Sequence, residues 1–432
     1  MKKIIYIGLL GIGTVGSGVA EVLHRNASTI ESRVGVPVKI KTILEKNPER
    51  AKSIPTYGAT ITSDINDILN DNEIDIVIEL IGGINPALDF ILRSLNAGKH
   101  VVTANKDLIA QHGRELLMTA EAKGLDFMFE ASVGGAIPII RPLKQCLAAN
   151  RITEIIGIIN GTTNYMLTKM TKENMDFAEV LAEAQAKGYA EANPTADVEG
   201  LDPARKIAIL ASIAFNSRVI LEDVYVEGIT NVSFEDIEAA RELGYTIKLL
   251  AIAKNDERGI DVRVHPAFIP DNHPLAAVSD VFNAIYVKGD AVGETMFYGR
   301  GAGSIPTASA ILGDAIDISR NILHNATGRI HCTCYDEKLL CPIGNIETPY
   351  YIRLLVEDKP GVFASIAKAF GDQQVSLHSV MQKRKIDQYA EIVLITYRVS
   401  YAKIMEAMKV LNNMSIVVKV SSVIRVEAEE IA

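Results

Sequence analysis

Ile4-Ile5-Tyr6-Ile7-Gly8-Leu9-Leu10 runs directly into Gly11-Ile12-Gly13-Thr14-Val15-Gly16 at the start of the chain. The apolar run predicts a buried strand, and the residues after Gly16 have the spacing of a helix. In this setting Gly11 permits a tight turn, Gly13 lets the backbone approach a pyrophosphate, and Gly16 lets helix and strand pack closely. The helix begins near Thr14 and Val15, and phosphate groups bind at such helix N-termini. The stretch therefore predicts a dinucleotide site, and its alternative is an ordinary glycine-rich turn.

Further apolar runs follow, with amphipathic stretches between them: Val38–Leu44, Ile74–Leu80, His100–Thr103 and Asp126–Phe129. Short runs of this kind are typical of parallel strands buried on both faces. They predict a doubly wound, Rossmann-like α/β domain over residues 1–135. Gly303 and Pro306 precede a helical stretch, which predicts a helix at about 306–324 that returns to this domain.

The rest of the chain predicts two further domains. Beyond Pro138 the pattern changes to longer helical stretches mixed with strands, which predicts an α+β domain over residues 136–325. Residues 326–349 lose this periodicity and carry several glycines and prolines, as a linker does. From 350 to 427 the strand and helix patterns follow the order βαββαβ, the ferredoxin-like arrangement.

The composition narrows the classes of function. The 432 residues carry 44 Lys and Arg against 53 Asp and Glu, a net charge of −9, and this argues against nucleic acid as a partner. Four cysteines are too few for a disulfide scaffold, which favours a reducing compartment, the cytoplasm. Met1-Lys2-Lys3 before the first apolar run imitates a secretory signal, but the glycines at positions 8, 11, 13 and 16 argue against one. No run reaches the roughly 18 apolar residues of a membrane span, so no membrane partner is expected.

A polar stretch, GYAEANPTADVEGLDPARK at residues 188–206, interrupts an otherwise apolar region. One interpretation is structural: Asp202 caps a helix with Pro203 in its first position and pairs with Lys206 one turn later. The other interpretation is chemical: Asp202 and Lys206 share a helix face and converge with Glu191 on a substrate that has an ammonium and a hydroxyl group. The carboxylates then bind the amine, and the lysine handles a proton.

Several segments together resemble the homoserine dehydrogenase family. The most specific is Ala184-x-x-x-Gly188 with Asn193-Pro194-x-x-Asp197-x-x-Gly200-x-Asp202-x-x-x-Lys206. The others are the GxGxVG fingerprint, ELIGG at 79–83, VVTANK at 101–106, NGTTNY at 160–165, and GAG at 301–303 before PTAS at 306–309. This resemblance covers residues 1 to about 325, and it implies that residues 136–325 form a domain for catalysis and dimerisation. The C-terminal βαββαβ segment resembles an ACT domain, a module that senses amino acids.

The resemblance implies reversible, NAD(P)-dependent hydride transfer between L-aspartate-4-semialdehyde and L-homoserine, in threonine and methionine biosynthesis. It implies that Lys206 is the acid/base and that Lys106, otherwise an ordinary exposed lysine, lies near substrate and nicotinamide. It also implies three sets of ligands: Glu191, Asp197 and Asp202 for the substrate; Gly188, Gly303 and Lys106 for the cofactor; and Glu130, Val133, Gly135 and Ile137 for a monovalent cation such as sodium. A glycine turn at a strand end is the alternative for the cation set.

The choice between NAD and NADP depends on the residues after the second predicted strand. An acid there binds a ribose 2′-hydroxyl and a base binds a 2′-phosphate, so Glu45 favours NAD whereas Lys46 and Arg50 favour NADP. NADP is preferred because biosynthetic reduction usually draws on NADPH.

The loop before the first helix of the third predicted domain is a candidate effector site. Asp358 and Gly361 stand where an amino acid's carboxylate meets helix N–H groups and its ammonium meets an acid. In the resembling ACT domains this site lies between two copies, which implies a homodimer or homotetramer. Threonine, the downstream product, is the expected inhibitor, and a plain capping turn is the alternative.

Other interpretations of the chain remain. A nucleotide-binding amino-acid sensor without catalysis is one rival, and another dehydrogenase on the same scaffold is a second. His331, Cys332, Cys334 and Cys341 suggest a metal, but the Cys-x-Cys spacing is not that of a zinc ribbon, and free thiols are favoured. Lys383-Arg384-Lys385 is expected to form a solvated hairpin turn.

Overall fold

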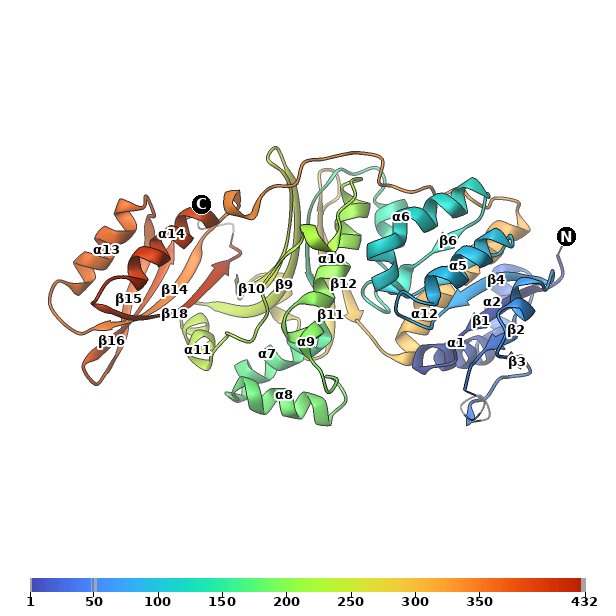
Figure 1. Ribbon diagram of the computed structural model, residues 1–432, viewed down its shortest axis with the longest axis horizontal. Helices are drawn as coiled ribbons and strands as arrows, with labels where there is room; N and C mark the ends of the chain where they lie inside the picture. The colour runs from blue at the N-terminus through green and yellow to red at the C-terminus, as the bar shows by residue number, and fades with distance from the viewer. Residues whose placement is uncertain (1, 48, 50–52, 429–432) are drawn as a thin grey trace. The chain divides into compact units, whose positions relative to one another are not determined.

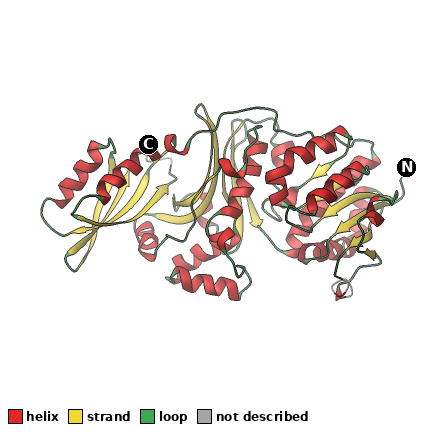
Figure 2. Ribbon diagram, viewed as in Figure 1, coloured by secondary structure: helices red, strands yellow, loops and turns green. Residues whose placement is uncertain are grey.

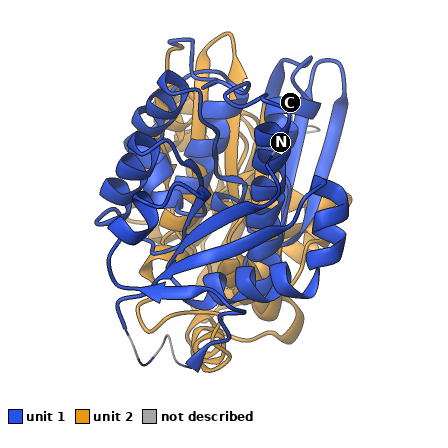
Figure 3. Ribbon diagram, turned by 90° about the vertical axis from the view of Figure 1, so that its right-hand side faces the viewer, with its two compact units in different colours: residues 1–153, 205–222, 283–337 blue, residues 154–204, 223–282, 338–432 orange. Residues whose placement is uncertain are grey.

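The computed structural model describes residues 2–47, 49 and 53–428 (Figure 1). The chain folds into two compact units, each made of three stretches (Figure 3). Unit 1 contains residues 1–153, 205–222 and 283–337, and unit 2 contains residues 154–204, 223–282 and 338–432. None of the described helices combines the length and apolar character needed to cross a membrane.

Unit 1 contains the parallel sheet that the first residues predict. Its strand order is β3-β2-β1-β4-β5-β6, and every described pair is parallel. The strands are β1 (Ile5–Leu10), β2 (Val38–Leu44), β3 (Thr60–Thr62), β4 (Ile74–Glu79), β5 (His100–Thr103) and β6 (Phe127–Met128). Strand β1 is almost completely buried, so the doubly wound α/β prediction is confirmed. Strand β3 was not predicted, because three residues that are largely exposed give no apolar run.

The helices of unit 1 are arranged around this sheet (Figures 1 and 2). They include α1 (Thr14–Arg25), α2 (Ala27–Val34), α4 (Asn66–Leu69), α5 (Ala87–Asn96), α6 (Lys106–Ala122) and α12 (Ser304–Leu323). The predicted return helix is α12, and it packs against α1. Ser304 Oγ donates to the Thr14 carbonyl at 2.6 Å. A Cβ on Gly18 would lie 2.5 Å from that hydroxyl, so the close approach of the two helices requires glycine there.

Unit 2 is built on long antiparallel strands. Strands β9 (Tyr245–Asp256) and β10 (Gly259–Pro270) pair along their whole length, and β7 (Ile152–Ile158) pairs with the other edge of β9. The remaining elements before the C-terminal segment are α7 (Gly161–Glu173), α8 (Phe177–Ala186), α9 (Thr195–Val198), β8 (Tyr225–Val226) and α11 (Phe234–Glu242). Helix α10 (Leu201–Ala214) begins in unit 2 and continues into unit 1, and unit 1 also contains almost all of the strand pair β11 (Phe282–Gly289) and β12 (Gly293–Arg300).

The C-terminal segment has the predicted βαββαβ order. It comprises β14 (Tyr350–Glu357), α13 (Val362–Asp372), β15 (Leu377–Ile386), β16 (Tyr389–Thr396), α14 (Tyr401–Asn412) and β18 (Val417–Val426). Apolar side chains from all six elements form one core. Strand β18 pairs with β14 on one side and, over two residues, in parallel with β10 on the other. The sheet of unit 2 therefore runs from the α+β segment into the C-terminal segment without a break.

The basic triplet at 383–385 differs from its prediction. Lys383 lies within strand β15 rather than at the hairpin turn, and only 9% of its side chain is exposed. Its ammonium pairs with Glu238 at 2.9 Å and with Glu242 at 3.3 Å, both on α11. The solvated-turn interpretation was wrong for Lys383, because a charge run gives no information about acids that are distant in sequence, whereas Arg384 and Lys385 are exposed as expected.

Candidate active site

The glycine turn between β1 and α1 has the geometry of a phosphate cradle. Gly11 has a φ of +94°, which a residue with a side chain rarely adopts. A Cβ on Gly16 would lie 2.2 Å from the Gly11 carbonyl, so only glycine allows the helix to start this close to the turn. Helix α1 begins at Thr14, directly after Gly13, and has no acid in its first turn. Its free N–H groups and positive dipole end suit the pyrophosphate of a dinucleotide.

A buried carboxylate shapes the neighbouring loop at the end of β4. Glu79 accepts hydrogen bonds from the backbone N–H groups of Ile81 and Gly82, at 2.7 and 3.1 Å, and from the Thr103 hydroxyl at 2.7 Å. Asn105 caps α6 and donates to the Gly83 carbonyl at 2.6 Å. Doubly wound sheets bind ligands at this edge. The sequence contained Glu79 within a resembling segment but gave no sign of its role, because a buried acid at a strand end has no spacing signature.

One ion pair in unit 1 connects the helices that carry the two candidate catalytic lysines. Lys106 is the first residue of α6, and Lys206 lies in the second turn of α10. Asp107 Oδ1 and Arg205 Nε, the sequence neighbours of these lysines, are 2.7 Å apart. The ion pair therefore holds the start of α6 beside α10 at the level of Lys206.

In unit 2 a single amide brings two predicted substrate-binding acids together. Asn160 Nδ2 donates to Asp197 Oδ1 at 2.7 Å and to Asp202 Oδ2 at 2.9 Å. Asn160 Oδ1 accepts from the Thr163 backbone N–H at 2.9 Å and so caps α7. Two carboxylates on one partly buried amide concentrate negative charge, which suits an ammonium ligand. Asn160 was not among the predicted site residues, although Asn before a helix is a recognisable cap signal.

The capping interpretation of Asp202 needs correction. Helix α10 begins at Leu201, and the Ala204 N–H donates to the Gly200 carbonyl at 3.1 Å. Asp202 and Pro203 are therefore the second and third helical residues, not the cap and the first. Gly200, with a φ of +81°, makes the turn into the helix.

Glu191 and Gly188 lie in the exposed loop after α8. Glu191 is exposed, and its carbonyl accepts from Gln185 Nε2 at 3.1 Å. Thr162 at the start of α7 holds the loop by donating to the Tyr189 carbonyl at 2.6 Å. Gly188 has a φ of +71° and follows the last turn of α8, so the backbone alone accounts for this glycine.

The residues expected to hold a cation surround a buried carboxylate. Glu130 Oε1 accepts from the N–H groups of Ile139 and Ile140, at 2.6 and 2.7 Å, and Oε2 accepts from that of Arg141 at 2.7 Å. Asp314 accepts from the Glu130 N–H and from the Arg141 guanidinium. Burial and the nearby Glu130 charge raise the pKa of Asp314 to about 7, against the effect of Arg141. Glu130 thus has a structural role as well as a proposed one.

The segment that follows, with Val133, Gly135 and Ile137, folds tightly against residues 300–301. Gly135 has a φ of +55°, and a Cβ there would lie 2.3 Å from the Gly301 carbonyl. Among the described residues no group of three or more His, Cys, Asp or Glu side chains has a metal-binding arrangement. A cation here would depend on backbone carbonyls and the one carboxylate, which hard monovalent ions accept.

Two of the residues expected to select the cofactor lie at the end of β2, and they differ in their contacts. The Glu45 carboxylate accepts from the Asn47 N–H at 2.9 Å, and Lys46 is exposed. Arg50 lies outside the described residues.

In the C-terminal segment the predicted effector loop carries an ion pair. Asp358 Oδ2 lies 2.9 Å from Lys385 Nζ of β15. Gly361 has a φ of +88° and immediately precedes α13, which begins at Val362.

A parallel doubly wound sheet with a glycine cradle, two helix-borne lysines and an acid pair defines a dinucleotide-dependent oxidoreductase. The family models agree over most of the chain. The homoserine dehydrogenase model matches residues 138–316, the model for its NAD-binding domain matches 11–130, and the ACT domain model matches 350–414. The chain belongs to the homoserine dehydrogenase family and carries a C-terminal ACT domain.

Two curated relatives and one solved structure are similar over nearly the full length, and a second solved structure covers about three quarters of the chain. The homoserine dehydrogenase of Bacillus subtilis is 45% identical over 98% of this chain and 99% of its own, and that of Mycobacterium tuberculosis is 43% identical over 99% and 98%. The crystal structure of a homoserine dehydrogenase from Thiobacillus denitrificans has a TM-score of 0.93 and 41% identity, with 98% of both chains covered. A hyperthermophilic archaeal homoserine dehydrogenase in complex with NADPH shares the fold, with a TM-score of 0.62 and 24% identity over 73% of this chain and 98% of its own.

Proposed function

We propose that this chain catalyses the reversible, NAD(P)-dependent interconversion of L-homoserine and L-aspartate-4-semialdehyde. The observation that carries the proposal is the Asn160 amide, which contacts both Asp197 of α9 and Asp202 of α10, and Asp202 lies one helical turn before Lys206. An acid pair suits the substrate's ammonium, and a lysine one turn away suits its reacting oxygen. Family membership supports the same reaction.

In this proposal each charged side chain has a separate task. The bound nicotinamide supplies or accepts the hydride. When an aldehyde is reduced, its oxygen gains negative charge, and the Lys206 ammonium stabilises that charge and delivers a proton to the oxygen. Asp197, Asp202 and Glu191 bind the amine, and Lys106 lies near both substrate and nicotinamide. Gly11, Gly13, Thr14, Val15, Gly16, Gly188 and Gly303 would hold the cofactor.

A spectrophotometric assay tests the reaction. L-homoserine with NADP or NAD should produce reduced nicotinamide, whereas 4-hydroxybutyrate, which lacks the amine, should react far more slowly because the acid pair has no ammonium to bind. No absorbance change with either cofactor would overturn the proposal and favour an inactive nucleotide-binding sensor. Equal rates with both substrates would favour a different dehydrogenase.

We further propose a preference for NADP over NAD. Lys46 is exposed beside the end of β2, while the Glu45 carboxylate is engaged by the Asn47 N–H. This arrangement supports a base for the 2′-phosphate more than an acid for the 2′-hydroxyl. Comparing kcat/KM for the two cofactors is the test, and a higher value with NAD would mean that Glu45 binds the ribose.

The proposal also includes a site for a monovalent cation and a site for an amino-acid effector. Sodium would bind Glu130 and the carbonyls of Val133, Gly135 and Ile137, and replacing sodium with a bulky organic cation should then lower the melting temperature. Threonine would bind at Asp358 and Gly361.

Strand β12 carries exposed Met296 and Tyr298, which supports association into a homodimer or homotetramer. The four free cysteines support the cytoplasm as the compartment.

A further inference from the structure

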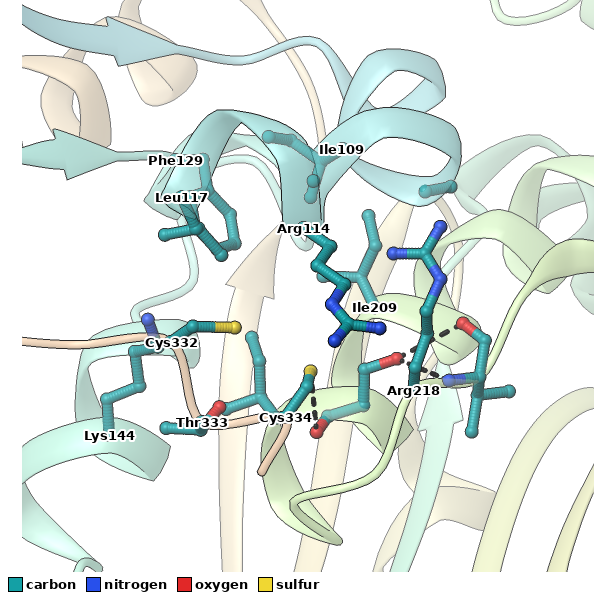
Figure 4. Close-up of a pocket in the computed structure, with 15 residues that line it drawn as sticks. Ile109, Arg114, Leu117, Phe129, Lys144, Ile209, Arg218, Cys332, Thr333 and Cys334 are labelled. Carbon is teal, nitrogen blue, oxygen red and sulfur yellow. Dashed lines mark hydrogen bonds between the residues drawn. The ribbon is translucent and has the colours of Figure 1, made fainter. Parts of the chain in front are cut away.

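Unit 1 has a pocket, distinct from the glycine cradle, that contains two thiols. It is a small hollow, with about 40 Å³ open to the centre of a water molecule, and it is lined by residues of α6, α10 and the stretch after α12 (Figure 4). Its walls include Ile109, Phe129 and Ile209, and its polar groups include Lys144, Cys332 and Cys334. We call residues 330–337, which contain both cysteines, the thiol strap.

Hydrogen bonds attach the thiol strap to the end of α10 and the turn after it. Asn216 Nδ2 donates to the Thr333 carbonyl at 3.1 Å, and the Asp336 N–H donates to the Asn216 carbonyl at 2.8 Å. Cys334 Sγ lies 3.6 Å from the Ser212 carbonyl oxygen, within hydrogen-bonding distance (Figure 4). These contacts place Cys334 against α10 and leave Cys332 two residues earlier in the same pocket.

The spacing of the two cysteines allows a bond between them. Both cysteines line the same pocket, and the chain bends between them at Thr333. Cα atoms two residues apart in a bent segment can fall within the roughly 7 Å that a disulfide requires. The Cys334 thiol is within hydrogen-bonding reach of the Cys332 sulfur. Since it has one hydrogen, it donates either to Cys332 or to the Ser212 carbonyl.

The surroundings make the two thiols chemically different. The hydrogen bond from Cys334 and the positive charge of Lys144 lower the pKa of Cys332 to about 6, against the effect of burial. The interaction with Cys332 and burial raise the pKa of Cys334. Cys332 therefore forms a thiolate, the reactive form of cysteine, more readily than Cys334 does. Both side chains are partly exposed, so a small oxidant can reach them.

We propose that Cys332 and Cys334 are a peroxide-sensitive pair that forms a reversible disulfide within the thiol strap. The Cys332 thiolate attacks one oxygen of a hydroperoxide, the O–O bond breaks, and a sulfenic acid and a hydroxide (or alkoxide) form. The hydroxide takes up a proton to become water. The Cys334 sulfur then attacks the sulfenic sulfur, the S–O bond breaks, and the second water leaves with the thiol proton. The two thiols together lose two electrons and two protons, and a dithiol reductant restores them.

A tryptic digest of the full-length protein tests this directly. Cleavage after Arg329 and Lys338 releases IHCTCYDEK, which contains Cys332 and Cys334 but neither Cys146 nor Cys341. After one equivalent of hydrogen peroxide and blocking of free thiols, this peptide should be unalkylated and lighter by two hydrogens, and dithiothreitol should reverse the change. Recovery of the peptide with both thiols alkylated, or a cross-link to Cys341, would overturn the proposal.

Two variants separate the attacking thiol from the resolving thiol. In C334S the sulfenic acid on Cys332 cannot be resolved, so dimedone should label residue 332 under peroxide; in C332S neither label nor disulfide should form. The double variant C146S/C341S retains only the pair and should lose two hydrogens as the parent does. Equal dimedone labelling of Cys146 and Cys332 in C334S would mean that the pocket confers no selectivity and would contradict the proposal.

Discussion

At the scale of single residues, the acid pair depends on the side chain that joins it. Asn160 uses its carbonyl oxygen to cap α7 and its amino group to contact Asp197 and Asp202. Helix α7 therefore fixes the amide, and the amide fixes both carboxylates. The sequence predicted the acids because carboxylates are recognisable as amine ligands. It did not predict the amide as a site residue, because its contacts lie 37 and 42 residues away.

The variant N160S separates the two roles of Asn160, which are to cap α7 and to contact the two carboxylates. Serine caps helices about as well as asparagine, but it lacks the amino group that contacts the acids. We expect the KM for homoserine to rise about tenfold, a loss of roughly 1.4 kcal/mol of substrate binding, while the melting temperature stays nearly constant. Steady-state kinetics and thermal melting measure the two effects. A lower melting temperature with an unchanged KM would mean that Asn160 only caps the helix and has no role in substrate binding.

The variant K206M tests the proton-transfer role. Methionine preserves the length of the side chain and removes the ammonium, so kcat should fall by about 10²–10⁴ while the cofactor dissociation constant changes little. K368M is the matched control, since Lys368 forms an exposed pair with Asp372 in the ACT domain. Turnover near the parent value in K206M would reject Lys206 as the acid/base.

At the scale of elements, strands β10 and β18 share a buried charged cluster. Glu427, the residue after β18, pairs with Arg263 at 2.7 Å, and His265 Nε2 accepts from Arg263 Nε at 3.0 Å. Burial, with Arg425 and Arg263 nearby, lowers the pKa of His265 well below its ordinary value. Arg263 and Lys254 hold the pKa of Glu427 low despite its burial. The folded chain therefore has a neutral imidazole beside a charged carboxylate.

This cluster predicts that acid destabilises the protein in two stages. A histidine whose folded pKa is depressed contributes stability above its unfolded pKa of about 6.5, and that contribution is lost as the pH falls below it. Glu427 follows the same sign with an unfolded pKa of about 4.3, so its contribution is lost only below that pH. Melting temperatures between pH 7.5 and 5 should fall in the parent and fall less in H265Q. Identical slopes in the two proteins would contradict the assignment.

The elements themselves could largely be predicted from the sequence, but their long-range pairing could not. The apolar runs identified β1, β2, β4 and β5 and the final βαββαβ order, because strand and helix periodicity is local. The pairing of β10 with β18 involves two residues on each strand, Ala267 with Arg425 and Phe268 with Val426. The sequence around each strand gives no sign of a partner strand about 158 residues away, because tertiary packing and not a sequence repeat brings the two strands together.

At the scale of the whole molecule, the ACT segment is bonded into unit 2. Arg353 of β14 pairs with Asp236 of α11 at 2.8 Å, and Arg425 pairs with Glu227 at 2.9 Å. The Arg425 guanidinium also lies over the rings of Tyr225 and Tyr401, each at 4.9 Å. Removing the segment would leave the buried Asp236 carboxylate without Arg353, at a cost of several kcal/mol. A point variant is therefore the better test of regulation.

The variant D358A tests the effector site within the intact fold. If an amino acid's ammonium replaces Lys385 at the Asp358 carboxylate, the threonine concentration that halves activity should rise at least about tenfold. D372A, at the far end of α13, is the control and should keep the parent's response. Indifference of the parent enzyme to millimolar threonine would leave the ACT segment without a regulatory role for this ligand.

Isotope transfer tests the central claim most directly. L-homoserine carrying two deuterium atoms at C4, incubated with the enzyme and oxidised cofactor, should give reduced nicotinamide that contains one deuterium and an aldehyde that retains the other. Mass spectrometry of both products measures this, and K206M should show the same transfer at a much lower rate. Reduced cofactor without deuterium, or no transfer at all in the parent enzyme, would contradict hydride transfer from homoserine.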